Sequence, residues 1–119
     1  MGNGLRLEVP GDSLYAFAPR VVAAWLVAGT GAEIDAVEDA RLAIDELVGA
    51  FVAAGRAVDV TFEEGDGVVT VEVVPPDQSL EVSLSPLAQR ILAVVAAGCG
   101  PLPDGRKGYR LSLRAGAMS

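Results

Sequence analysis

Two valine-rich segments separated by a short turn place the strongest constraint on how this chain can fold. From Ala57 to Glu63 apolar side chains alternate with polar ones, and the same alternation runs from Val68 to Val74. A period of two is typical of strands that bury one face and expose the other. Gly65, Asp66 and Gly67 separate the two segments, and such residues suit a tight hairpin turn. The sequence therefore predicts an antiparallel β-hairpin with one buried face.

The clearest helix in the sequence precedes this hairpin. Apolar residues recur at helical spacing between Asp35 and Ala54, which gives the segment one apolar face. Asp35 and Glu38 resemble a capping box, in which two residues three positions apart cap the first turn of a helix. Gly55 stands where a glycine commonly follows the end of a helix. We therefore expect a helix from Asp35 to Ala54.

Two further helices are expected, one on each side of this central region. The first begins near Ala18, because Pro19 is tolerated in the first turn of a helix but not in its interior. Gly29–Gly31 ends it. The third begins at Ser85, which is followed by a proline, and these residues suit the N-cap and the first helical position.

Alternating residues also predict a strand from Leu5 to Val9 and another from Tyr109 to Leu113. Gly98 and Gly100 are expected to end the third helix, and the segment from Pro101 to Gly105 is expected to be a loop. The expected order of elements is β-α-α-β-β-α-β, within one domain that spans residues 1–119. Hairpin-paired strands with helices of matching length favour an α+β fold, in which a mainly antiparallel sheet carries the helices on one face.

The composition argues against several classes of function. The formal net charge is −7 and the chain has no histidine. An acidic chain without clustered Lys and Arg is poorly suited to nucleic acids or anionic membranes. Histidine is the commonest metal ligand, and a single cysteine can form neither an internal disulfide nor a thiolate cluster. We therefore expect no metal site and interpret Cys99 as a small core residue.

Nothing in the sequence indicates a targeting or membrane-spanning segment. The first ten residues contain no apolar run of the kind found in signal peptides. The longest apolar stretch, Val21 to Ala28, is far shorter than the ~20 residues that span a bilayer. We therefore expect a cytoplasmic protein.

Two groups of residues could form contacts with partners. Arg106, Lys107, Arg110 and Arg114 concentrate positive charge near the C-terminus of this acidic chain. They could contact an acidic partner, or they could protect a solvated edge strand from pairing with other chains.

The second group is aromatic and comprises Trp25 with Tyr15 and Phe17. Core packing of the first helix is the interpretation we favour for these side chains. The alternative is a surface for a dimer or another partner, in which an exposed Trp25 would be a candidate for a binding hot spot.

The second helix also carries a resemblance to a known family. From Ala40 to Phe51 it resembles the N-box helix of the anti-sigma factor serine/threonine kinases, and the valine hairpin follows at the family's spacing. Leu87–Leu92 resembles the family's helix after the ATP lid, and Arg106–Leu113 resembles its last strand, so the similarity covers nearly the whole chain. These kinases are cytoplasmic bacterial regulators with the ATPase fold of histidine kinases. The resemblance implies that fold here, with a shortened lid region.

The N-box itself departs from the family. There a Glu is followed four residues later by an Asn, which binds magnesium, while the Glu assists phosphoryl transfer. Here Glu46 is present, but Ala50 stands at the Asn position, and alanine offers no oxygen to a hard cation. Glu46 would be catalytic only if kinase activity survives, and a solvated or helix-paired carboxylate is the interpretation we favour. Asp45 beside it is expected to be surface charge.

The second departure follows the hairpin. The family carries there an Asp-x-Gly-x-Gly box, which binds adenine, and then a lid over the phosphates. Here Asp77 has no glycine near it, and about ten residues separate Val74 from Ser85. Asp77 is at most a relic of the adenine contact, and a turn residue is the favoured interpretation. Phosphoryl transfer depends on such positioning groups, so we expect no kinase activity.

Two functions are compatible with this resemblance. The first is a regulatory protein-binding module that resembles an anti-sigma factor, uses no cofactor, and binds a sigma factor or an anti-anti-sigma protein as a monomer or a homodimer. The alternative is a divergent ATP-dependent protein-serine kinase, which would use Glu46, ATP and magnesium and act on an anti-anti-sigma factor. Both partners are implied by the family alone.

Overall fold

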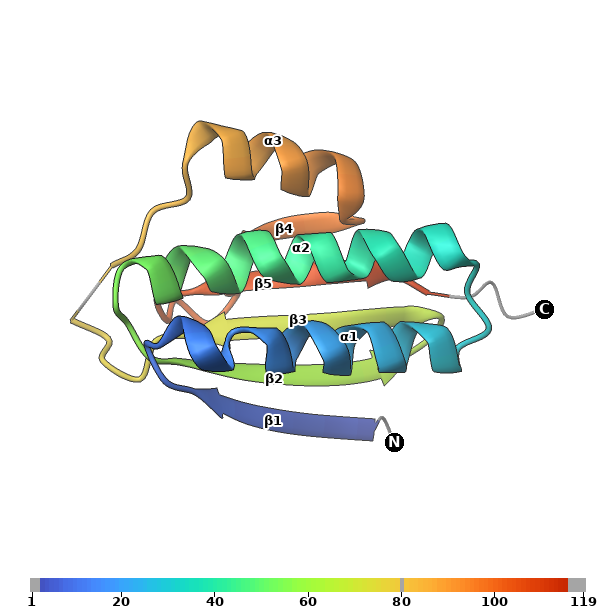
Figure 1. Cartoon of the computed structure of the whole chain (residues 1–119), viewed down its shortest axis with the longest axis horizontal. Helices are drawn as coiled ribbons and strands as arrows, with labels where there is room; N and C mark the ends of the chain where they lie inside the picture. The colour runs from blue at the N-terminus through green and yellow to red at the C-terminus, as the bar shows by residue number, and fades with distance from the viewer. Residues whose placement is uncertain (1–2, 80, 116–119) are drawn as a thin grey trace.

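The computed structural model describes residues 3–79 and 81–115 (Figure 1). Along the chain the elements are β1 (Asn3–Val9), the short 3₁₀ helix η1 (Ser13–Tyr15), α1 (Phe17–Gly29), α2 (Ile34–Ala53), β2 (Val58–Gly65), β3 (Val68–Val74), α3 (Pro86–Val95), β4 (Gly98–Pro101) and β5 (Tyr109–Arg114).

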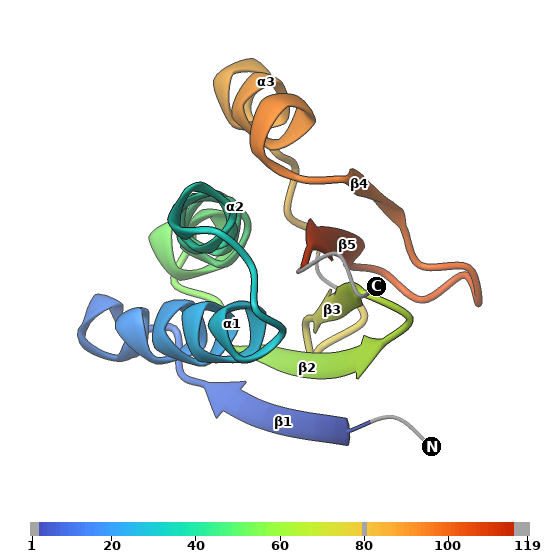
Figure 2. The ribbon, with the colours of Figure 1, turned by 90° about the vertical axis from the view of Figure 1, so that its right-hand side faces the viewer.

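The described strands form one five-stranded sheet in the order β1-β2-β3-β5-β4, and every neighbouring pair is antiparallel. Figure 2 shows the molecule along its layers: α1 and α2 lie on one side of the sheet, and α3 lies beyond α2, near β4. Within the described residues, no helix lies on the opposite face. The expected α+β architecture, with an antiparallel sheet and helices on one face, is confirmed.

The predicted hairpin is present, and its turn explains the sequence between the two strands. Gly65 lies opposite Val68 in the register of β2 and β3, so only Asp66 and Gly67 form the turn. Both have positive φ angles, 54° and 73°. Positive φ at both central residues is the mark of a type I′ turn, whose twist matches that of the flanking strands.

Helix α1 begins close to the expected residue, but α2 begins differently from the prediction. Pro19 lies in the first turn of α1, where its missing N–H costs nothing. Glu33 is the N-cap residue of α2, and its side chain makes no capping hydrogen bond. The predicted capping box is therefore wrong: Asp35 already lies inside the helix, and Glu38 pairs with Arg41 at 3.1 Å.

The end of α2 and the start of α3 agree with the predictions from the sequence. Gly55 has a φ of 72° directly after the last capping residue of α2, a conformation that glycine adopts without strain. At the start of α3, the Ser85 hydroxyl accepts a hydrogen bond from the backbone N–H of Ala88 at 3.0 Å. These caps confirm the predicted end of α2 and the predicted start of α3.

Strand β4 was not expected, because Gly98 and Gly100 were predicted to end the third helix and Pro101 to begin a loop. Gly98 lies opposite Ser112 and Pro101 opposite Tyr109, so the segment after α3 turns back and pairs with β5. The backbone N–H of Ala97 adds a hydrogen bond to the carbonyl of Ser112 at 2.8 Å. As a consequence β5 lies inside the sheet, and β1 and β4 are its two edges.

The core lies between the sheet and the helices. Alternate residues of β2, β3 and β5 point into it and are fully or almost fully buried, as the period of two requires. The largest buried side chains come from α2 and these strands: Phe51, Phe62, Ile44, Leu47, Leu111 and Leu113. Across the part of the chain that the structure describes, no helix has the length and hydropathy needed to cross a membrane.

Candidate functional site

The residues at the N-box positions lie on α2, one turn apart. Glu46 and Ala50 are both half-buried. No described residue pairs with the half-buried Glu46 carboxylate, which agrees with the solvated form of the favoured interpretation. Asp45, expected to be plain surface charge, binds Arg20 of α1 at 3.2 Å and so links the two helices.

The space between α2 and the end of the sheet is only partly filled by protein, since Phe51, Val82 and Tyr109 line a hollow of about 300 Å³ there. Phe51 of α2 is buried, and its ring meets that of Tyr109 edge to face, with centroids 6.3 Å apart. The Tyr109 hydroxyl donates a hydrogen bond to the carbonyl of Val82 at 3.0 Å. Burial raises the pKa of the Tyr109 phenol. These three residues, here called the closed junction, join α2, β5 and the segment after β3.

Asp77 forms a local turn. Its carboxylate accepts hydrogen bonds from the hydroxyl and the backbone N–H of Ser79. The hydroxyl hydrogen bond, more than any other contact, holds the pKa of the exposed Asp77 carboxyl below its usual value. The turn interpretation of Asp77 is therefore confirmed. Leu80, which follows in the same connection, lies outside the described residues.

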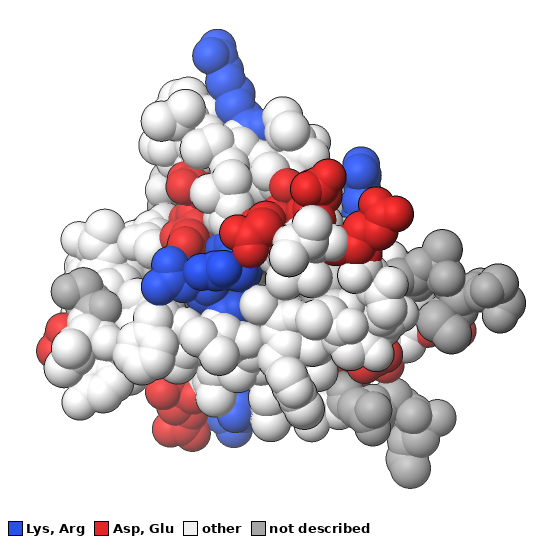
Figure 3. Space-filling view, turned by 45° about the vertical axis from the view of Figure 1, so that its right-hand side comes forward, with Lys and Arg blue, Asp and Glu red and all other residues white. Residues whose placement is uncertain are grey.

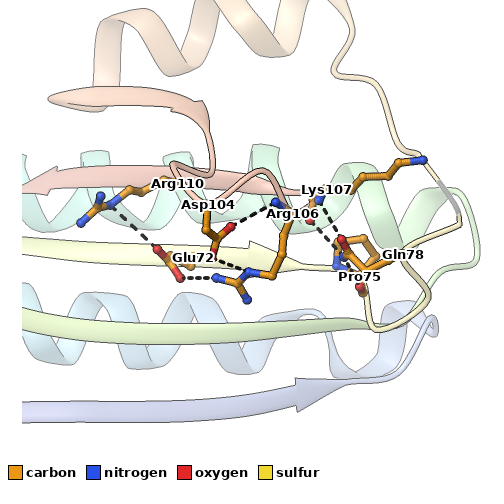
Figure 4. Close-up of polar contacts among 7 residues, drawn as sticks. All are labelled: Glu72, Pro75, Gln78, Asp104, Arg106, Lys107 and Arg110. Carbon is orange, nitrogen blue, oxygen red and sulfur yellow. Dashed lines mark hydrogen bonds and ion pairs between the residues drawn. The ribbon is translucent and has the colours of Figure 1, made fainter.

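Gln78 ties this connection to the loop before β5, as Figure 4 shows. Its amide nitrogen donates to the carbonyl of Pro75 at 2.8 Å and to that of Lys107 at 3.2 Å. Its amide oxygen accepts from the backbone N–H of Lys107 at 2.8 Å. In the described residues between β3 and α3, 75–79 and 81–85, there is neither helix nor strand. Sequence alone did not single out Gln78, because Lys107, its partner in the other loop, lies 29 residues away.

The basic residues near the C-terminus are divided between internal ion pairs and solvent. Arg106 pairs with Asp104 at 2.7 Å and with Glu72 of β3 at 3.3 Å (Figure 4). Arg110 lies 4.0 Å from the same Glu72 carboxylate. The hydrogen bond from the Arg106 backbone N–H is the main cause that lowers the pKa of Asp104. Because β5 is an inner strand, the expected role in protecting an edge is wrong.

Other hollows lie at the surface, and the one beside Trp25 is mainly apolar, whereas the others have mixed linings. The largest beside α3 has a volume of about 410 Å³ and lies between that helix and β4, where Leu92, Ala96 and Cys99 line it. Cys99 is exposed, so its predicted place in the core is wrong, although partial shielding from water raises the pKa of its thiol. Among the described residues, no group of His, Cys, Asp and Glu could hold a metal ion.

Helix α1 presents an apolar side to solvent. Trp25 is 70% exposed and Phe17 is 53% exposed, so the predicted core packing of these aromatics is wrong. The exposed large hydrophobic residues of η1 and α1 are here called the α1 face: Leu14, Tyr15, Phe17, Val21 and Trp25. Figure 3 shows a broad area without charged side chains, bordered above and below by charged groups, on this side of the molecule.

Helix α3 presents a second exposed strip. Leu87, Arg90 and Val94 lie three or four residues apart, so they share one side of the helix. All three are exposed, Val94 to 74%. No described residue pairs with the Arg90 guanidinium. We call these three residues the α3 ridge.

Comparison with known proteins gives no family for the chain. None of the protein-family models matches it, and none of the curated proteins shows significant similarity to it.

Proposed function

We propose that this protein is a regulatory protein-binding module of the anti-sigma type, which binds a sigma factor or an anti-anti-sigma protein and has no kinase activity. The proposal rests on the resemblance of the sequence to the anti-sigma factor kinases, and it includes the ATPase fold of histidine kinases. The observation that carries it is the closed junction. Phe51, Tyr109 and Val82 join α2, the sheet and the segment after β3, and they leave a hollow of about 300 Å³ beside them.

The N-box position and the connection after β3 support the same conclusion. Ala50 provides no ligand for magnesium, and Glu46 lies beside it without a partner among the described residues. Asp77 uses its carboxylate to hold its own turn, and Gln78 fastens that turn to the loop before β5. A chain built in this way would act through its surface rather than through nucleotide chemistry.

The α3 ridge is the surface we assign to the partner. Leu87 and Val94 are apolar and exposed, and the unpaired Arg90 lies between them. This arrangement fits an amphipathic partner segment with an acidic side chain between apolar ones, because an ion pair at the centre would fix the register of the apolar contacts. Arg90 is the one charged residue of α3, so it would select for an acidic side chain at the centre of such a segment.

The test is a binding assay between this chain and the sigma factors and anti-anti-sigma proteins of its source genome. We expect one of them to bind. Arg90→Glu and Val94→Asp should each raise the Kd of that complex at least about tenfold, which corresponds to about 1.4 kcal/mol of binding free energy. Ile34→Asp is the matched control, because Ile34 is 75% exposed but lies at the start of α2. Binding to none of these proteins would refute the proposal, and equal losses in all three variants would refute the α3 ridge.

A second measurement addresses the nucleotide. Isothermal titration with magnesium and ATP at millimolar concentration is expected to give no binding heat. Saturable heat, together with phosphate transfer to a serine of an anti-anti-sigma protein, would instead establish the kinase alternative with Glu46 as its candidate catalytic group.

A further inference from the structure

One carboxylate lies on the helix side of the sheet, where the other residues of β2 that point the same way are apolar. These residues are Val58, Val60 and Phe62, all fully buried, and they are followed by Glu64. Glu64 is half-buried, and no described residue pairs with its carboxylate. A carboxylate that loses part of its water without gaining a partner is costly. Glu64 would therefore be stabilised by a cation that another molecule supplies.

Glu64 lines a mainly apolar hollow of about 310 Å³ between α1 and the sheet. The described residues around it come from β1, α1 and β2: Gly4, Leu5, Trp25, Leu26, Gly29 and Glu64. Among them Glu64 is the one charged residue, and the two glycines leave space that side chains would otherwise fill. Trp25 is 70% exposed, so its indole is accessible to a partner. The hollow combines one negative charge with an aromatic ring and apolar walls.

The basic residues of the surrounding elements are engaged elsewhere. Arg6, the one basic residue of β1, follows Leu5 and so points to the opposite face of the sheet, where it pairs with Asp59 at 2.9 Å. Arg20, the one charged residue of α1, pairs with Asp45 of α2 at 3.2 Å. β2 contains neither Lys nor Arg. The three elements that form the hollow therefore provide no cation for Glu64.

The chemistry of the hollow favours a guanidinium group over other cations. A guanidinium stacks on an aromatic ring and donates two parallel hydrogen bonds to a carboxylate, and it is more weakly hydrated than an ammonium group. It therefore loses less on entering a mainly apolar hollow. The apolar α1 face continues from Trp25 to Val21 and Phe17, which suits apolar residues beside an arginine in a protein chain. The net charge of −7 also attracts a basic segment.

We propose that the hollow between Trp25 and Glu64 binds an arginine side chain of a protein partner. The guanidinium lies against the Trp25 indole and donates hydrogen bonds to the Glu64 carboxylate, while apolar residues beside the arginine cover the α1 face. This site is separate from the α3 ridge, because α2 lies between α1 and α3 (Figure 2). It does not depend on the anti-sigma function proposed above.

Trp25 is the one tryptophan of the chain, so its indole N–H gives a single NMR signal that reports on the hollow. The full chain is titrated with Nα-acetyl-arginine amide and with the citrulline analogue, which has the same shape without the charge. We expect the arginine compound to shift the signal saturably at millimolar concentration and the citrulline compound to leave it unchanged. The acetylated tripeptide amide Leu-Arg-Leu is expected to bind at least about fivefold more tightly than the arginine compound, because its leucines reach the α1 face.

Two matched variants test the carboxylate. Glu64→Gln is expected to raise the Kd of the tripeptide about tenfold, because it removes charge-assisted hydrogen bonds. Glu63→Gln is the control, since Glu63 is exposed on the opposite face of the same strand, and it should leave the Kd within about twofold of the wild type. Circular dichroism checks that both variants are folded.

Four results would overturn the proposal. The first is the absence of a saturable shift with the arginine compound, and the second is equal binding of the citrulline compound. The third is an equal effect of Glu64→Gln and Glu63→Gln on the Kd. The fourth is a tripeptide that binds no more tightly than the arginine compound, which would indicate a site for a small arginine-like ligand instead of a protein partner.

Discussion

Phe51 and Tyr109 meet with their ring planes at 76° to each other and their centroids 6.3 Å apart. One ring comes from the middle helix and the other from the first residue of β5, and the Tyr109 hydroxyl reaches on to the carbonyl of Val82. A single contact therefore joins three parts of the chain that are distant in sequence. It also narrows the space between helix and sheet to a hollow of about 300 Å³.

This contact should carry a large share of the stability. Phe51→Ala is expected to lower the free energy of unfolding by about 3–5 kcal/mol, because it removes a fully buried ring. Tyr109→Phe keeps the ring and removes the hydrogen bond to Val82, so about 1 kcal/mol is expected. Urea unfolding followed by circular dichroism measures both. Equal losses in the two variants would contradict the expectation that ring packing contributes more than the hydroxyl hydrogen bond.

Restoring the missing metal ligand should not restore nucleotide binding. Ala50→Asn supplies the amide oxygen that the family's N-box has, next to Glu46. The closed junction remains, however, and the connection after β3 still has no lid, so titration with magnesium and ATP is expected to give no heat. Because Ala50 is only half-buried, the variant should stay folded by circular dichroism. Saturable binding of magnesium and ATP by this variant would mean that the missing Asn side chain, rather than the closed junction, prevents binding in the wild type.

Two glycines should respond to alanine in opposite directions. Gly108 has a φ of 130°, and an added Cβ would collide with the carbonyl oxygen of Val73 and press on the Val74 backbone. Gly108→Ala should therefore lower the free energy of unfolding by several kcal/mol, on the scale of other backbone strain with overpacking. Gly49 lies inside α2 with open space around its Cβ position, so Gly49→Ala should raise stability by about 0.5–1 kcal/mol. Midpoints of thermal unfolding measure the pair, and a stable Gly108→Ala protein would contradict the close approach.

The cap of α3 gives a smaller and more local prediction. Ser85→Ala is expected to cost about 1 kcal/mol and Ser85→Gly only a few tenths, because glycine suits the N-cap backbone even without a hydroxyl. The loss should appear as faster amide exchange within α3, since Ser85 caps the N–H of Ala88. Unchanged exchange at Ala88 and Gln89 in the alanine variant would show that the hydroxyl does not hold this end of the helix.

The sequence predicted elements whose signals are local. The turn at Asp66 and Gly67 and the cap at Ser85 depend on neighbouring residues, and both are confirmed. β4 has no such signal, because Gly98, Cys99 and Gly100 neither alternate nor favour strands, and only pairing with β5 makes them one.

The exposed side of α1 could not be read from its sequence for a different reason. The helix is apolar around most of its circumference, so periodicity does not say which side is buried. Close packing against α2 selects the smaller residues Pro19, Ala23 and Val27 for the interior and leaves Trp25 outside. The ion pairs of Glu72 could not be predicted from the sequence either, because they depend on the register of β3 with β5 and on the loop before β5.

The loop before β5 should loosen in acid through Asp104. The backbone N–H of Arg106 donates to its carboxylate at 3.0 Å, and this hydrogen bond is the main cause that lowers the pKa of Asp104 in the folded protein. A lowered pKa means that the stabilising contribution is present above the ordinary aspartate pKa of about 3.9. It is then lost as the pH falls through the lower value of the folded state. The Arg106 amide chemical shift should therefore titrate with a midpoint below about 3.9, and Asp104→Asn should abolish that titration. A midpoint at or above the value of free aspartate would contradict the hydrogen bond that orders this loop.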